Sequence, residues 1–260
     1  MKKNILSIAT IQMNVRWEDI PRNINRLKGF LKKIKTDVDL LVLPEMWTTG
    51  FSMNTKLAET MNGLGVSTMR VIAREFKIVV CGSLMIRERG KFYNRLIWMQ
   101  PDGKYLTYDK RHLFGLGGEQ KHFSPGKKIL SIELNGWKIR PMICYDLRFP
   151  VWSRNSDGYD LLIYVASWPK KRIVAWDTLL KARAIENQSY LIGLSRVGKD
   201  GLDVEQSGNS VVLGPLGEVI ATESRREKII YAELKKSDLE KIRKQLPFLK
   251  DADEFTLNVK

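Results

Sequence analysis

The stretch Asp39-Leu-Leu-Val-Leu-Pro-Glu45 sets the pattern of the whole chain. Its aliphatic run has no polar alternation, which is typical of a short strand covered on both faces. Proline cannot donate the next ladder hydrogen bond, so the strand ends there and leaves Glu45 at the rim of the sheet. A second strand-like stretch, residues 137–144, ends in the same way at Tyr145-Asp146. Two buried strands that each end at polar residues point to a site at their ends.

Strand-like and helix-like segments alternate on both sides of these two stretches. Apolar residues at helical spacing predict helices over 20–34, 66–76 and 173–188, with another beginning near residue 149. Apolar runs bounded by turn signals predict strands over 5–13, 78–86, 92–99, 160–167, 190–197, 210–213, 218–222 and 228–233. A Ser-x-x-Glu capping pattern at Ser237 predicts a last helix that begins there and stops at Pro247.

The chain is expected to form one domain, because no linker, repeat or low-complexity segment divides its 260 residues. The alternation of strands and helices in both halves predicts an α/β fold built on two related halves. Residues 1–260 are therefore taken as a single domain. Within it, residues 235–260 are expected to pack on a partner subunit or to form a tail.

Composition excludes several classes of protein. With 43% hydrophobic and 28% charged residues, the chain is neither disordered nor fibrous. No apolar run approaches the roughly 18 residues that span a bilayer, so no membrane partner is expected. The only two cysteines, Cys81 and Cys144, predict reduced thiols and a cytoplasmic location. Cys81 lies inside an apolar strand and is assigned to the core.

Lysine and arginine number 44 against 29 acidic residues, which gives a net charge of +15. A nucleic-acid-binding protein is one way to explain this excess, and it would bind with a steep dependence on salt. A solvated lysine-rich surface is the better explanation. Because the chain has no zinc-finger spacing or aromatic RNA-binding motif, no nucleic-acid partner is expected.

Four ionisable residues are the candidates for chemistry. Cys144 stands at the end of a buried strand just before an expected helix, a position that favours a reactive thiolate. Glu45 stands at another strand end beside apolar residues and suits a general base. Lys110 and Glu119 would individually pass for surface residues. In the order Glu45, Lys110, Glu119 and Cys144, however, they carry a recognisable pattern.

This ordered set resembles the nitrilase (carbon–nitrogen hydrolase) superfamily over nearly the whole chain. The matching motifs are Leu-Pro-Glu at 43–45, Tyr-Asp-Lys-Arg-His-Leu-Phe at 108–114, the glutamate before Phe-Ser-Pro-Gly at 123–126, and Ile-Cys-Tyr-Asp-Leu-Arg-Phe-Pro at 143–150. Residues 144–155, 182–188 and 251–255 are similar to its bacterial omega-amidase (2-oxoglutaramate amidase) branch. The short Gly117-Gly118 segment departs from the longer insert that several members carry before the second glutamate.

The resemblance implies a four-layer α-β-β-α sandwich, paired into a homodimer through the face that carries the helix after the cysteine. It implies hydrolysis of a small amide without a metal or organic cofactor. The expected substrate is 2-oxoglutaramate or 2-oxosuccinamate, which would give the 2-oxo diacid and ammonia. A nitrilase, or an N-acyl or N-carbamoyl amidohydrolase, would use the same residues and remains the alternative within the superfamily.

The resemblance also assigns roles. Cys144 is the nucleophile and Glu45 the base, Lys110 and the Tyr145 backbone N–H stabilise the oxyanion, and Glu119 holds Lys110 or the substrate amide. Because an arginine fork suits a carboxylate, Arg172 and Arg196 are the candidates for binding the substrate carboxylate. The aromatic candidates for lining the pocket are Trp47, Phe51 and Trp168. Arg148 and Arg183 are expected to be structural.

A Cys–His hydrolase is the rival mechanism outside this superfamily. It requires a histidine beside Cys144 and a third group to orient that histidine. His112 and His122 are the two histidines in the chain. His112, two positions after Lys110, is better explained by the family motif at 108–114. Replacing each histidine in turn would decide, because the rival mechanism needs one of them to be indispensable.

Overall fold

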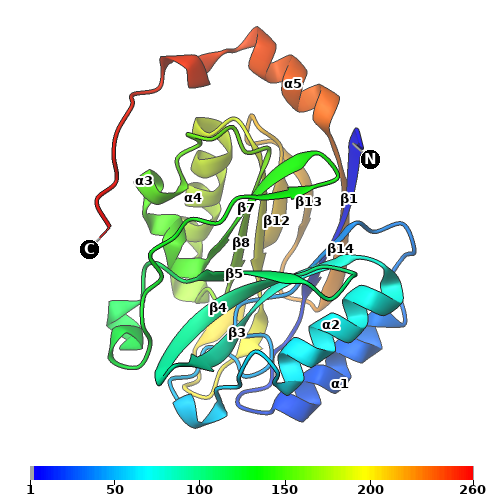
Figure 1. The fold of residues 1–260 in the computed structure, drawn as a ribbon, viewed down its shortest axis with the longest axis vertical. Coiled ribbons are helices and arrows are strands. Elements are labelled where there is room, and N and C mark those ends of the chain that lie inside the picture. Colours follow the sequence, from blue (N-terminus) through cyan, green and yellow to red (C-terminus); the bar gives the residue numbers. More distant parts are fainter. Residues whose placement is uncertain (1–2, 260) are drawn as a thin grey trace.

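A computed structural model describes residues 3–259, so residues 1–2 and 260 of the expected domain lie outside the described residues. Two six-stranded mixed sheets lie against each other, and helices cover their outer faces (Figure 1). The predicted four-layer α/β sandwich is confirmed.

The first sheet has the order β14-β1-β2-β3-β4-β5. Its strands are β1 (Ile5–Gln12), β2 (Leu40–Val42), β3 (Val79–Glu88), β4 (Lys91–Met99), β5 (Tyr105–Asp109) and β14 (Lys228–Lys235). Strands β1, β2 and β3 are parallel, and the other three run antiparallel to their neighbours.

The second sheet has the order β13-β12-β9-β8-β7-β6. Its strands are β6 (Ile132–Leu134), β7 (Trp137–Ile143), β8 (Leu161–Ala166), β9 (Tyr190–Ser195), β12 (Ser210–Leu213) and β13 (Val219–Glu223). Its parallel core is β7, β8 and β9. A separate two-stranded ribbon pairs β10 (Val197–Lys199) with β11 (Glu205–Ser207).

The two sheets repeat one arrangement. Each has three parallel strands in the middle, one antiparallel strand on one side and two on the other. The matching triplets are β1-β2-β3 and β7-β8-β9. This repetition confirms the expectation of two related halves, and it places the ends of corresponding strands in equivalent positions.

The helices are α1 (Ile20–Leu31), α2 (Leu64–Phe76), α3 (Pro150–Ser153), α4 (Ile173–Glu186) and α5 (Lys236–Gln245). Helices α1 and α2 cover the first sheet, while α3 and α4 lie by the second (Figure 1). The aliphatic run of β2 divides between two cores because alternate side chains point to opposite faces. Leu40 and Val42 enter the core between the sheets, and Leu41 and Leu43 pack towards α1 and α2.

The helix expected from residue 149 is a single turn, α3, preceded by a 3₁₀ helix over Cys144–Arg148. Asn155 explains why α3 stops. Its side chain accepts a hydrogen bond from the Tyr159 amide and donates to the Tyr159 carbonyl, at 2.8 and 3.0 Å. Such side-chain bonds to the backbone compete with helix formation and close a loop that leads into β8.

The predicted capping role of Ser237 is wrong. Helix α5 begins one residue earlier, at Lys236, and no side chain of its own caps it. Asn4 takes over this role from a distant segment: its Oδ1 accepts the Ser237 amide at 2.9 Å. After α5, the chain continues past a short turn (Phe248–Asp251) and runs along the outside of the molecule (Figure 1). Whether residues 235–260 contact a partner stays a prediction.

Candidate active site

Four strand ends meet at one cavity of about 580 Å³. From the first sheet, β2 leads to Glu45 and β5 ends next to Lys110. From the second sheet, β7 ends at Cys144 and β8 at Ser167. All four residues line the cavity, with Glu45, Lys110 and Cys144 at 0%, 1% and 9% exposure. The structure therefore brings together three of the four candidate catalytic residues around a space fit for a small molecule.

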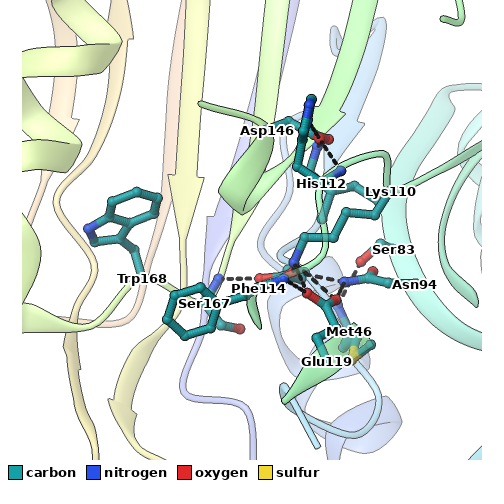
Figure 2. Close-up of polar contacts among 12 residues, drawn as sticks. Met46, Ser83, Asn94, Lys110, His112, Phe114, Glu119, Asp146, Ser167 and Trp168 are labelled. Atoms are coloured by element: carbon teal, nitrogen blue, oxygen red, sulfur yellow. Dashed lines mark hydrogen bonds and ion pairs between the residues drawn. The ribbon is translucent and has the colours of Figure 1, made fainter. Parts of the chain in front are cut away.

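Lys110 lies between two buried carboxylates (Figure 2). Its Nζ is 2.9 Å from Glu45 Oε1, and 3.1 and 2.9 Å from the two oxygens of Glu119. Glu119 is fully buried and stands behind Lys110 rather than in the cavity lining. Because two carboxylates face a single ammonium, both of their negative charges favour the charged form of Lys110.

The protonation of Lys110 follows from two opposing effects. Burial lowers the pKa of the ammonium, but the charges of Glu119 and Glu45 outweigh burial and raise the pKa above its ordinary value of 10.5. Burial also raises the pKa of Glu119, and Lys110 acts against that rise. Lys110 is therefore a fixed positive charge at neutral pH.

Both carboxylates are held by groups that the sequence patterns did not single out. Asn94 of β4 donates its side-chain amide to Glu45 Oε1 at 2.8 Å. The same amide donates to Glu119 Oε1 at 3.3 Å (Figure 2). The Phe114 backbone amide donates to Glu119 Oε2 at 2.6 Å. The Ser167 backbone amide donates to Glu45 Oε2 at 2.8 Å. These bonds fix both carboxylates against rotation.

The backbone on both sides of the cavity is unusual. Cys144 has φ 43°, and Met46, next to Glu45, has φ 44°, so both are left-handed positions occupied by residues other than glycine. Such conformations are strained and persist only where surrounding contacts enforce them, and they cluster at functional sites. Two hydrogen bonds are among these contacts. The Met46 backbone amide donates to Ser83 Oγ, and the Ile143 backbone amide, next to Cys144, donates to Asp146 Oδ2.

The Cys144 thiol is neutral in this environment. Burial and the neighbouring Glu45 carboxylate raise the pKa of the thiol well above its ordinary value of 9.0, while Lys110 and the Ser167 amide act in the opposite direction. The resting pair is thus a thiol beside a carboxylate. A neutral nucleophile with an adjacent base suits chemistry in which the proton moves during attack.

The histidines serve other purposes. His112 Nδ1 lies 2.8 Å from Asp146 Oδ1, and its ring stacks on Phe149 with the centroids 3.7 Å apart. Asp146 also accepts the Tyr108 hydroxyl at 2.7 Å, so this cluster anchors the turn that carries Cys144. His122 is exposed. Among residues 3–259, neither histidine lines the cavity, which removes the basis for a Cys–His mechanism.

Of the five residues expected to contact substrate, Phe51, Trp168 and Arg172 line the cavity. Trp47 does not, because it is fully buried in the core under α1 and α2. Arg196 does not line it either. Its guanidinium is fully buried and donates to the Val197 and Lys199 carbonyls, and burial lowers its pKa to about 10. Arg196 thus holds the β10 segment rather than facing a ligand.

Arg148, expected to be structural, lines the cavity instead. Its guanidinium carbon lies 5.2 Å from the Trp168 ring centroid, and that of Arg172 lies 5.1 Å from the Phe114 ring centroid. Neither arginine forms an ion pair with any residue in the range 3–259. Two partly exposed guanidinium groups, each held against an aromatic face, place positive charge on the cavity wall, which Glu18 and Asp200 also line. Arg183, in contrast, is buried and bonds the Leu147 carbonyl, as expected of a structural residue.

Two further findings concern ligands and membranes. No cluster of three or more histidine, cysteine or acidic side chains in the described chain is arranged to hold a metal ion. No helix within residues 3–259 is long and apolar enough to cross a membrane.

Comparison with known proteins agrees with this geometry. Omega-amidase YafV of Escherichia coli (strain K12) is 41% identical over 97% of this chain and 98% of its own. The 2-oxoglutaramate amidase of Bacillus subtilis (strain 168) is 33% identical over 94% and 96%. The crystal structure of XC1258 from Xanthomonas campestris, described as a CN-hydrolase superfamily protein with an arsenic adduct in its active site, is 37% identical. It superimposes with a TM-score of 0.96 over 98% of this chain and all of its own. The Carbon-nitrogen hydrolase family profile matches residues 7–244, and the chain belongs to this family.

Proposed function

We propose that the protein is an omega-amidase that hydrolyses the side-chain amide of 2-oxoglutaramate or 2-oxosuccinamate, releasing ammonia and the 2-oxo diacid. The observation that carries this proposal is the convergence of Glu45, Lys110 and Cys144 on one cavity that Arg148 and Arg172 also line. The relatives named omega-amidase and 2-oxoglutaramate amidase, which match over nearly the full length, support the same substrate class.

Acylation begins with the Cys144 thiol. As sulfur attacks the amide carbonyl carbon, its proton passes to Glu45 Oε2, the carboxylate oxygen that is not bonded to Lys110 and Asn94. A C–S bond forms and the carbonyl π electrons move to oxygen, giving a tetrahedral oxyanion. Glu45 then gives the proton to the amide nitrogen, the C–N bond breaks, and ammonia leaves a thioester on Cys144.

Lys110 and the Tyr145 amide would stabilise the oxyanion. Tyr145 is the second residue of the 3₁₀ helix that begins at Cys144, and first-turn amides have no partner within a helix. Lys110 supplies a full positive charge that needs no reorganisation during the reaction, because Glu45 and Glu119 fix its ammonium in place. Preorganised donors of this kind contribute about 3–4 kcal/mol each.

Deacylation uses the same groups with water in place of ammonia. Ionised Glu45 takes a proton from water, whose oxygen attacks the thioester carbonyl. The C–S bond then breaks, and the Cys144 thiolate recovers its proton from Glu45. Glu119 would keep Lys110 charged and in position through both halves of the cycle.

The substrate carboxylate fits the part of the cavity that Arg148 and Arg172 line. Arg148 and Arg172 supply planar guanidinium groups that pair with carboxylates through two parallel hydrogen bonds. A neutral amide would leave both cations without a partner. We therefore place the 2-oxo acid end at these two arginines, with Phe51 and Trp168 packed beside it.

A substrate comparison tests the proposal against the alternatives within the family. Purified protein would be offered 2-oxoglutaramate, glutamine, an aliphatic nitrile and an N-carbamoyl amino acid at equal concentrations, with product formation measured for each. We expect kcat/KM to be highest for 2-oxoglutaramate. Preference for the nitrile or the carbamoyl compound would assign the protein to another branch of the family.

We also propose a homodimer that pairs through the face of α3 and α4 and works in the cytoplasm. Val151, Val174 and Ile185 on this face are 51%, 76% and 47% exposed, more apolar surface than a solvated helix layer needs. Both cysteines are free thiols, as in a reducing compartment. Sedimentation equilibrium should give twice the chain mass, and Val174→Glu should shift the protein to a monomer.

A further inference from the structure

Ser167 carries a hydroxyl that the mechanism above does not use. The residue follows β8, lines the cavity with Cys144, and is only 7% exposed. Its Oγ is buried and has no hydrogen-bond partner among residues 3–259. A buried polar atom without a partner is costly, so an unpartnered oxygen on a residue that lines the cavity points to a ligand as its hydrogen-bond partner.

The backbone of Ser167 fixes where this hydroxyl lies relative to the reacting groups. Its amide donates to Glu45 Oε2 at 2.8 Å and also favours the thiolate form of Cys144. Ser167 therefore flanks both the base and the nucleophile. Lys110 lies on the other oxygen of the same carboxylate, Oε1. Ser167 therefore lies near Oε2 of Glu45, whereas the Lys110 ammonium, which would stabilise the oxyanion, lies near Oε1.

In the proposed mechanism, the nitrogen of a bound amide would lie near this position. The nitrogen must receive its proton from Glu45 Oε2, so it has to lie next to that oxygen and hence next to Ser167. An amide NH₂ group offers two N–H donors and needs acceptors around it. A serine hydroxyl supplies two acceptor lone pairs.

We propose that the Ser167 hydroxyl accepts a hydrogen bond from the N–H of the substrate amide and holds the nitrogen at Glu45. This inference rests on the amidase function proposed above. It makes Ser167 a catalytic residue that favours amides over acyl compounds whose leaving group has no N–H. The contact persists through the tetrahedral intermediate, because the nitrogen keeps both of its hydrogens until ammonia leaves.

The test compares two leaving groups on one acyl chain. 2-Oxoglutaramate and the S-methyl thioester of 2-oxoglutarate form the same acyl-enzyme, but the thioester has no N–H to donate. For Ser167→Ala we expect kcat/KM to fall about 5- to 10-fold on the amide, the loss of one neutral hydrogen bond, and to change less than about 2-fold on the thioester. Because only the side chain changes, the backbone bond to Glu45 remains.

Ser207→Ala is the matched control. Ser207 is also 7% exposed and its Oγ also lacks a partner, but it does not line the cavity. This variant should leave both substrates within about 2-fold of wild type. Thermal unfolding of each variant checks folding, and Ser167→Gly provides a second protein without the hydroxyl.

Two outcomes overturn the inference: an equal loss on amide and thioester, or no loss on the amide. Failure of the proposed function gives a different result, because the wild type would then prefer another substrate. In that case the same comparison applies to the primary amide that the wild type hydrolyses best and to its S-methyl thioester.

Discussion

The backbone amide of Ser167 lies 2.8 Å from Glu45 Oε2, and this single bond joins the end of β8 in the second sheet to the residue beyond β2 in the first. The two residues are 122 positions apart. Base and nucleophile therefore come from different halves of the chain, and the site exists only when the two sheets are packed together. Activity and the packing of the two sheets should be lost together during unfolding.

Replacing Asn94 tests whether the two carboxylates must be held. Asn94→Ala removes the side-chain amide that bridges Glu45 and Glu119. We expect kcat/KM to fall about 10- to 100-fold, because a misplaced base loses its alignment with the thiol. Asn155→Ala is the control: Asn155 is also buried but lies outside the cavity lining, so this variant should lower the melting temperature without a comparable loss of kcat. Full activity in Asn94→Ala would show that the bridge is dispensable.

Removing the charge of Glu119 should change the pH dependence of the reaction. In Glu119→Gln, burial still lowers the pKa of Lys110, while the largest of the charges that raise it is gone and only Glu45 and Cys144 remain to raise it. The pKa of Lys110 therefore falls relative to wild type. Lys110 must be protonated to act, so activity is present below its pKa and lost above it. The alkaline limb of kcat/KM should therefore move to lower pH.

The control for this pH profile is Glu88→Gln, which removes a partly exposed carboxylate paired with Arg95 outside the cavity. Its alkaline limb should match that of wild type. An unmoved limb in Glu119→Gln would contradict the role assigned to this carboxylate.

The two cavity arginines should control recognition of the substrate's charge. Arg148→Gln and Arg172→Gln should each raise KM for 2-oxoglutaramate about 10- to 100-fold, since each removes a charged hydrogen-bonding group. Hydrolysis of a neutral amide such as butyramide should be unaffected or improved. Lys170→Gln, which changes an exposed charge paired with Glu205 outside the cavity lining, serves as the control. Equal losses on both substrates would argue against carboxylate binding.

The sequence indicated Glu45 and Cys144 because each stands at a strand end that an apolar run makes visible. Lys110 was singled out only by the motif at 108–114, because no apolar run marks the strand before it. Asn94 was missed because it lies inside β4, where hydropathy alone marks no boundary. A signal was present, however: Asn94, Leu96 and Trp98 alternate along one face of this strand, and Leu96 and Trp98 belong to the core between the sheets. A polar side chain on the buried face of a strand needs a hydrogen-bond partner that is buried as well.

The errors had local causes that composition does not reveal. Trp47 and Phe51 both follow Glu45 closely, yet only Phe51 lines the cavity. The left-handed backbone at Met46 turns the chain so that Trp47 enters the core under α2. Arg196 follows a strand end just as Glu45 does, but its guanidinium donates hydrogen bonds to the Val197 and Lys199 carbonyls instead of facing the cavity. Such turns depend on backbone geometry rather than on hydropathy.

The central claim is that Cys144 is acylated by an amide substrate during turnover. The most direct measurement is intact-protein mass spectrometry on enzyme quenched in acid while it hydrolyses 2-oxoglutaramate, combined with peptide mapping. The expected result is an adduct with the mass of the substrate less ammonia, located on the peptide that contains Cys144. Cys144→Ala should carry no adduct and release ammonia at least about a thousandfold more slowly, with an unchanged fold. Ammonia release by Cys144→Ala at a rate near that of wild type, or an adduct on another residue, would contradict the mechanism.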